Sequence, residues 1–551
     1  MKRINSALFL ATVASMALAS AASAQTTPAP GPNDGDAKLH GAGASSVTNV
    51  VNDEIDWLKA NEPLFDASYI ATGSGTGKAA WRNKTPQLTA YGIPYSTWNT
   101  VQYAFADSSI NASDLATYNA NMKPAAGNGI MVPKFVLPVA FAYNPVYAKA
   151  GSTEYRFNVQ NPQSLPDAVT GVNKVVGGLR LNRAAYCGIF NGTIVNWNDS
   201  ALTTLNGGVS LKDPTDGATF SVPIRLVGRV DKSGTTDIFT RALTAQCSGT
   251  RYAGNAEALA YNPADTLGPN FTAARADTPY KPGSPASNFT SLVNSVGNQY
   301  FDKASGTIMS VTGGVPSQPT SATANGTGLF LLADGSSGVS AAIAADPDIG
   351  TTTRRVNGKI GYVGSDYIAN AKGASQKVFA AALSRPGPTS GTYYLPSAAN
   401  GAAAVGTIVP PQSTSAGIYL NTAAGDRADP LSWYNILYPT PSSGLANPNG
   451  GYPVTGTTQI LLNTCYKATN FPHVVKWLGY NMATPTTVFT DPVTGILAKS
   501  NIAAVPDNWK HAITQTFLVN SNENSGGRLG DRDLWIEAAS ATSDHCNVTG
   551  N

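Results

Sequence analysis

The chain has 551 residues, enough for two or more core-forming domains, and 42% of them are hydrophobic, which excludes a chain that is disordered throughout. Charged residues make up only 13%, about half of the usual ~25%, and the net charge of +3 falls to +1 without the first 24 residues. No basic surplus is available to hold nucleic acid or an anionic membrane, so we expect no nucleic-acid partner.

The first 24 residues have the pattern of a secretory signal peptide. Lys2 and Arg3 precede an apolar run from Ala7 to Ala19 that is too short to span a bilayer, and Ala22-Ser23-Ala24 offers a cleavage site after Ala24. An uncleaved anchor helix is the alternative. Residues 25–38, rich in Pro, Gly and Asp, are expected to form a disordered leader. We therefore expect a periplasmic or secreted protein.

Expected helices and strands alternate along the rest of the chain. In chain order we expect a helix over Asn49–Ala60, an extended segment Ala67–Thr72, a helix from Lys78, a buried strand pair in Gly129–Tyr143, a helix over Leu181–Phe190, a strand over Val222–Val230, a helix over Thr235–Ala245, strands over Lys359–Val363 and Gln459–Leu462, and helices over Val474–Met482 and Asn508–Thr516. This alternation favours α/β architecture with largely parallel sheets. Two turn-rich segments, residues 248–301 and 384–451, are expected to be long surface insertions.

Four cysteines remain after the signal segment: Cys187, Cys247, Cys465 and Cys546. An even number in an exported chain suggests disulfides, and the simplest of the three possible pairings is the local one, Cys187–Cys247 and Cys465–Cys546. A metal site is the alternative. The sequence has no C-x-x-C motif, and only His545 neighbours a cysteine, so we expect no metal.

Three turns built from small residues come directly before expected helices. They are Gly41–Ser46, Gly73–Gly77 and Ser233–Thr236, and the last of them follows Arg229 by four residues. Small residues let backbone N–H groups converge, hydroxyl groups add donors, and a helix N-terminus favours an anion. One such turn is weak support for a binding site, whereas three turns and an arginine favour an anion site.

Asp107 follows an apolar segment and precedes two serines, in the sequence Ala104–Ser109. One interpretation is a helix cap for the segment from Ser113. The other is a carboxylate in an anion site, which would accept a hydrogen bond from a protonated oxyanion and repel one without a proton. Such a group would select phosphate over sulfate.

These motifs resemble those of periplasmic phosphate-binding proteins, most closely the DING-type branch. Gly73–Ala80 is similar to the branch's G-S-G-x-G-K-A-A, Cys187–Trp197 to C-G-x-F-x-G-x-I-x-x-W, and Arg229–Thr236 to R-x-[DE]-x-S-G-T-T. Val101–Tyr118 resembles the segment that carries the phosphate-discriminating aspartate, and the cysteine positions support the local pairing. The chain departs from the branch at Ser46, where the family has a bulky apolar residue, and in lacking the N-terminal D-I-N-G.

The resemblance implies a two-lobed type II periplasmic-binding-protein fold. Each lobe would be a mixed sheet flanked by helices, and two crossover strands would join the lobes near Val132–Pro138 and Tyr452–Gln459. Lobe 1 would comprise residues 39–133 and 452–551, and lobe 2 would comprise residues 134–451, including both insertions.

The resemblance also implies a function: an exported, monomeric, high-affinity protein that captures inorganic phosphate in the cleft for uptake, without a cofactor, and delivers it to a membrane phosphate transporter. A secreted phosphatase of the DING type is the alternative, and we assign no catalytic residue. Asp231 is expected either to hold the Arg229 guanidinium or to be only a turn acid. The expected phosphate ligands are Ser45, Ser46, Ser74, Asp107, Arg229, Ser233, Gly234 and Thr235.

Overall fold

The computed structural model describes residues 39–83, 101–191, 194, 196–229, 231–247, 299–312, 315–317, 330–385, 391–411, 427–440, 443–519, 534–543 and 545–551. The expected signal peptide, the leader and most of the first expected insertion lie outside these ranges. Within these ranges, each helix is too short or too polar to cross a membrane.

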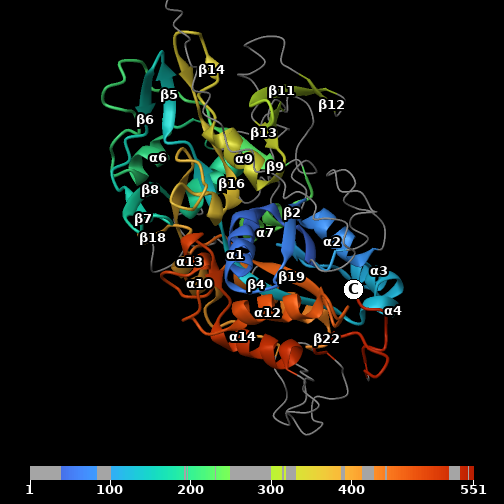
Figure 1. Ribbon diagram of the computed structural model, residues 1–551. Helices are drawn as coiled ribbons and strands as arrows, with labels where there is room; N and C mark the ends of the chain where they lie inside the picture. The colour runs from blue at the N-terminus through green and yellow to red at the C-terminus, as the bar shows by residue number, and fades with distance from the viewer. Residues whose placement is uncertain are drawn as a thin grey trace, which may run out of the picture.

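A mixed sheet of 16 strands forms the body of the molecule, and its main path runs β12-β11-β10-β13-β9-β16-β4-β19-β3-β1-β2 (Figure 1). Strand β1 runs parallel to β2 and β3, and β9 runs parallel to β13 and β16. The expected fold class, α/β with mixed sheets in two lobes, is confirmed. The expectation of largely parallel sheets is wrong, because β4 pairs antiparallel with β19 and β16, and β19 pairs antiparallel with β3. The strands of the path are β1 Leu39–Gly43, β2 Ala67–Ala71, β3 Tyr103–Ala106, β4 Gly129–Tyr143, β9 Arg225–Arg229, β10 Gln299–Asp302, β11 Thr307–Thr312, β12 Val315–Ser317, β13 Phe330–Ala333, β16 Lys359–Gly364 and β19 Thr455–Asn463.

Strand β4 belongs to both halves of this sheet. Its residues Gly129–Pro138 pair with β19, and its residues Val139–Tyr143 pair with β16. The prediction of a strand pair in this segment is wrong, because each half of one long strand has its own partner. We call β19, β3, β1 and β2 the first half-sheet, and β16, β9, β13, β10, β11 and β12 the second half-sheet.

Helices pack on both half-sheets because one face of each is apolar. In α1, Val51, Ile55 and Leu58 recur at helical spacing and are buried. Figure 1 shows α12 and α14 at the opposite end of the molecule from the strands β5 (Val146–Ala150) and β14 (Ile349–Gly350). The main helices are α1 Thr48–Asn61, α2 Ser74–Arg82, α3 Ala112–Asn121, α5 Arg183–Asn191, α7 Gly234–Cys247, α9 Gly335–Ala344, α12 Phe471–Met482 and α14 Asp507–Ile513.

Helix α2 begins at Ser74, four residues before the predicted start at Lys78. Two of the glycines that suggested a turn therefore lie inside the helix. A Cβ atom on Gly77 would lie 2.5 Å from the Cα atom of Gly43 in β1, so glycine is needed there for close helix–strand packing.

The expected surface insertion at 384–451 is partly buried, which corrects that prediction for its described parts. Helices α10 (Ala398–Val405) and α11 (Pro430–Asn435) pack on β4, and Trp433 is fully buried. The small residues that suggested a loop allow a close approach: a Cβ on Gly401 would lie 2.8 Å from the Pro138 ring. The end of the other expected insertion forms β10 in the sheet.

The described part of the chain contains two disulfides, and they confirm the local pairing. Cys187–Cys247 joins α5 to the last residue of α7, and Cys465–Cys546 joins β20 (Cys465–Tyr466) to the C-terminal segment. His545 lies beside the second pair. Because those two sulfurs are bonded to each other, this group does not offer thiolates to a metal.

Candidate functional site

The expected ligands gather where parallel strands end. Ser45 and Ser46 follow β1, Ser74 follows β2, Asp107 follows β3, and Arg229 is the last residue of β9. Ligands of α/β proteins bind at this carboxyl edge. The structure brings all eight expected residues to this edge and buries them: Ser45, Ser46, Ser74, Asp107, Arg229, Ser233, Gly234 and Thr235.

The carboxylate of Asp107 lies at the centre of the site. Its Oδ2 accepts hydrogen bonds from Ser46 Oγ (2.5 Å) and Thr235 Oγ1 (2.8 Å), and its Oδ1 accepts one from Thr458 Oγ1 (2.8 Å). Its backbone N–H donates to Ser74 Oγ at 3.1 Å. Burial raises the pKa of Asp107, although the three hydroxyl donors and Arg229 oppose that shift. Hydroxyl groups from both half-sheets therefore converge on one acid.

The interpretation of Asp107 as a helix cap is wrong. Helix α3 begins at Ala112, and its cap is Asn111, whose side chain accepts from the Asp114 N–H while the Asp114 carboxylate accepts from the Asn111 N–H. The side chain of Asp107 is thus available to the site.

Asp231 holds the guanidinium of Arg229. Arg229 Nε donates to Asp231 Oδ1 at 2.6 Å, and Nη2 donates to the other carboxylate oxygen. Burial alone would lower the pKa of Arg229, but the Asp231 charge raises it above its usual value, and Arg229 lowers the pKa of Asp231 in return. Asp231 is therefore more than a turn acid: it fixes a permanent positive charge in the site.

Ser336 is one site residue that the sequence analysis missed. Its hydroxyl accepts from Arg229 Nη1 at 3.1 Å, and its backbone N–H donates to Ser45 Oγ at 2.9 Å. The signal for it is present in the sequence: Gly335–Gly338 is a fourth run of small residues that begins a helix after a strand, and Gly335 has a φ of 66°.

Thr458 is the second missed residue, and a β-bulge places it. In the β4–β19 ladder Thr458 lies opposite Phe135 and Gln459 lies opposite Pro133, so Lys134 is the extra residue. Lys134 is fully buried and forms an ion pair with Glu54, which also accepts from Trp477 Nε1 at 2.9 Å. A buried ion pair thus holds the bulge beside the strand that carries Thr458.

Replacing Thr458 with valine removes one donor from Asp107 at nearly constant volume. A hydrogen bond to a charged group is worth about 1.5–3 kcal/mol, so we expect the pKa of Asp107 to rise by about one unit or more. An NMR titration of the Asp107 carboxyl carbon measures it. The control is Thr457→Val, because the Thr457 hydroxyl bonds to Gln459 and not to Asp107. An unchanged Asp107 titration in Thr458→Val would contradict the assignment.

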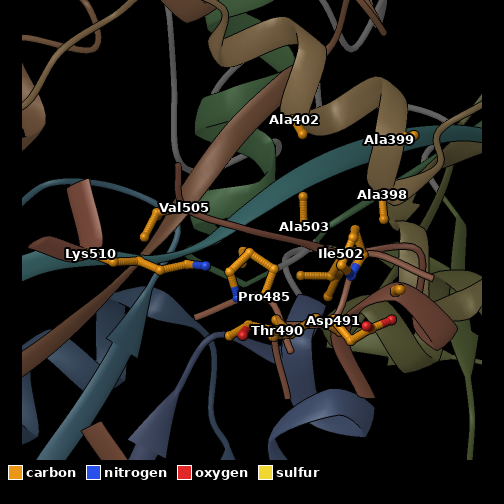
Figure 2. Close-up of a pocket in the computed structure, with 14 residues that line it drawn as sticks. Ala398, Ala399, Ala402, Pro485, Thr490, Asp491, Ile502, Ala503, Val505 and Lys510 are labelled. Carbon is orange, nitrogen blue, oxygen red and sulfur yellow. The ribbon is translucent and has the colours of Figure 1, made fainter. Parts of the chain in front are cut away.

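A separate pocket of about 170 Å³ lies away from this site (Figure 2). Apolar side chains form most of its wall, with Ala398 of α10 across from Ile502 and Ala503. The Lys510 amine reaches into it and pairs with Asp507 at 2.9 Å. It shares no residue with the expected ligands.

Comparisons with known proteins agree with this architecture. A family model described as a PBP superfamily domain matches residues 21–448. The chain is 26% identical over 459 residues to alkaline phosphatase L of Pseudomonas aeruginosa, covering 83% of each chain, and 26% identical over 467 residues to a phosphate-binding protein of an unknown prokaryotic organism, covering 84% of this chain and 90% of that one.

Solved structures show the same fold. A crystal structure of a DING protein superposes with a TM-score of 0.55 at 23% identity, and a high-affinity periplasmic phosphate-binding protein, PfluDING, bound with phosphate, superposes with 0.54 at 22% identity. Each comparison covers 93% of this chain and 99% of the other.

Proposed function

Because the chain belongs to the PBP superfamily, we propose that it binds inorganic phosphate between its two lobes. The observation that carries the proposal is the convergence of a buried acid, Asp107, and a buried guanidinium, Arg229, at one edge of the sheet, with hydroxyl groups from both half-sheets around the acid. Hydrogen phosphate carries oxygens that accept hydrogen bonds and one hydroxyl that donates, so it needs both kinds of partner. The relatives that are named phosphate-binding proteins support the proposal.

The proposed ligands are those expected from the sequence, together with Ser336. Arg229 and the serine and threonine hydroxyls donate hydrogen bonds to the oxygens of the anion, and the Asp107 carboxylate accepts a hydrogen bond from its hydroxyl group. For this, Ser46 and Thr235 turn their hydroxyls from Asp107 Oδ2 to phosphate oxygens, while Thr458 keeps Oδ1. The free-energy cost of removing water from the ion is offset by its hydrogen bonds to these side chains.

We propose lobe 1 to be residues 39–133 with 452–551, and lobe 2 to be residues 134–451, joined where β4 and β19 cross. Closure of the lobes encloses the ion. We further propose that the protein works outside the cytoplasm and hands phosphate to a membrane transporter.

Isothermal titration of the phosphate-free protein tests the proposal. We expect a dissociation constant below about 1 µM, equivalent to about 8 kcal/mol, and no comparable heat from sulfate. Absence of binding at millimolar phosphate would overturn it.

Phosphomonoester hydrolysis is a second candidate, favoured by the hydrogen bond from Ser46 Oγ to Asp107 and by the relatives named alkaline phosphatase L. Ser46 Oγ would attack phosphorus as Asp107 takes the hydroxyl proton, and the bond from phosphorus to the ester oxygen would break. Water would then hydrolyse the Ser46 phosphoester, releasing phosphate and restoring the serine. The close contact around Gly234 opposes it, because an enclosed anion leaves no room for an organic group. Release of p-nitrophenolate from its phosphate ester, abolished in Ser46→Ala, would support this candidate, and no release would exclude it.

Gly234→Ala tests whether close contact between the lobes is needed. A Cβ on Gly234 would lie 2.6 Å from Ser74 Oγ and 2.8 Å from Asp107 Cβ, and Cβ atoms in proteins do not approach their neighbours this closely. We expect the alanine to hold the lobes apart and to weaken phosphate binding at least tenfold, about 1.4 kcal/mol, in the same titration. Gly479→Ala is the control, because a Cβ on Gly479 meets nothing within 4 Å. Equal affinities for the two variants would contradict the closed site.

A further inference from the structure

A second, polar pocket of about 250 Å³ adjoins the proposed phosphate site from outside. Its wall includes Gly75, Ser108 and Gly234, each of which follows a proposed ligand directly in the chain. The three segments that form the inner site therefore also form this pocket. We call it the outer pocket.

The outer pocket is lined by three cations, Lys78, Arg82 and Lys232, and one carboxylate, Asp114. Arg82 is paired with Asp114. Lys78 Nζ donates to Ser108 Oγ (3.0 Å) and to the carbonyl of Ser109 (2.8 Å), which are both neutral groups. Across the described ranges, neither Lys78 nor Lys232 forms a direct ion pair with an acid, although the carboxylates of Asp114 and Asp237 lie close enough to act on Lys78.

Burial lowers the pKa of Lys78, and the charges of Asp114 and Asp237 only partly oppose that shift. A dianion in the pocket would therefore find a cation whose charge is incompletely stabilised.

The two lysines stand on opposite sides of the cleft. Lys78 lies in α2 beside the first half-sheet, whereas Lys232 lies just after β9 of the second half-sheet. The segments meet here, since the Gly75 N–H donates to the Lys232 carbonyl at 3.2 Å. The outer pocket is thus at the mouth between the lobes.

We propose that the outer pocket is a capture subsite, in which a hydrated phosphate dianion is held between Lys78 and Lys232 before it passes Gly234 to reach Asp107. This inference rests on the proposed function. A Cβ on Gly234 would lie 2.7 Å from the Ser108 nitrogen, so in this closed arrangement the backbone at Gly234 separates the two places. The outer pocket and the inner site therefore hold the ion one after the other, and capture acts on the rate of binding.

Stopped-flow tryptophan fluorescence, with the whole protein and inorganic phosphate, tests the proposal. For Lys78→Gln/Lys232→Gln at low ionic strength we expect the association rate constant to fall about tenfold while the dissociation rate constant changes less than twofold. Added NaCl should slow association to the wild-type protein and affect the variant far less. Lys232→Gln alone changes an exposed side chain and should slow association about threefold.

Lys123→Gln is the matched control, because Lys123 is an exposed lysine of α4 (Lys123–Ala126) outside the pocket. The capture subsite would be overturned if both outer-pocket variants associated with phosphate at the wild-type rate. It would also be overturned if affinity fell only because the dissociation rate constant rose. Tight pyrophosphate binding that needs both lysines would also overturn it, because the two places would then hold one condensed anion. If the wild-type protein binds no phosphate at equilibrium, the proposed function itself fails.

Discussion

Arg229→Ala is expected to weaken phosphate binding about a thousandfold, or about 4 kcal/mol. The variant loses charged hydrogen bonds worth about 1.5–3 kcal/mol each, in a site from which water is excluded. It also leaves Asp231 without its cation, so that a half-buried negative charge faces an anion. Titration calorimetry with phosphate measures the loss.

The control for Arg229 lies on the same strand. Arg225, at the other end of β9, is also buried and pairs with an acid, Asp348, at 2.7 Å. Arg225→Ala should lower the melting temperature in the same way as Arg229→Ala but leave the phosphate affinity within about threefold. Arg229→Lys keeps the charge but loses the planar, two-pronged donor, so its phosphate affinity should lie between those of the wild-type protein and Arg229→Ala. Equal phosphate affinity in Arg229→Ala and Arg225→Ala would refute the role of Arg229.

Asp107→Asn is expected to raise sulfate affinity about a hundredfold, or about 2.7 kcal/mol, and so to remove the discrimination between the two anions. Sulfate has no proton at neutral pH, so in the wild-type protein one of its oxygens would face the Asp107 carboxylate with no hydrogen between them. Asparagine presents an N–H to that oxygen. Competition titrations with both anions measure the ratio, and a variant that still rejects sulfate would show that discrimination lies elsewhere.

The same acid predicts the pH dependence of sulfate binding. Burial raises the pKa of Asp107, so as the pH falls the carboxyl takes up a proton earlier than an ordinary aspartate would. Rejection of sulfate is thus present above this raised pKa and is lost below it. We expect sulfate binding to the wild-type protein to increase as the pH falls towards this value, and binding to Asp107→Asn to show no such step.

Asp107 also links the site to stability. Because its pKa is higher in the folded chain than in the unfolded chain, its ionisation opposes folding at neutral pH, and this cost is relieved as the pH falls through the folded pKa. Asp107→Asn removes the charge and should raise the melting temperature of the phosphate-free protein. A lower melting temperature would mean that its three hydroxyl partners outweigh the burial of the charge.

The residues that could be predicted from the sequence are those with local signals. Asp107 and Arg229 stand beside strand ends and runs of small residues, and these patterns depend on a few neighbouring positions. Thr458 bonds to an acid 351 residues away, and its position depends on a bulge in a strand pairing that no local pattern encodes. The packing of α10 on β4 could not be predicted either, because the small residues of α10 indicate close packing only once the distant strand that they contact is known.

Strand β4 constrains how the two lobes move. Its backbone pairs with β19 along one part and with β16 along the rest, and the pairing with β19 continues on both sides of the bulge at Lys134. We expect the proposed opening of the lobes to twist this paired strand, with small changes of dihedral angle spread over many residues instead of a bend at one hinge residue. The open and closed forms are then expected to share the backbone hydrogen bonds that β4 makes with β19 and β16.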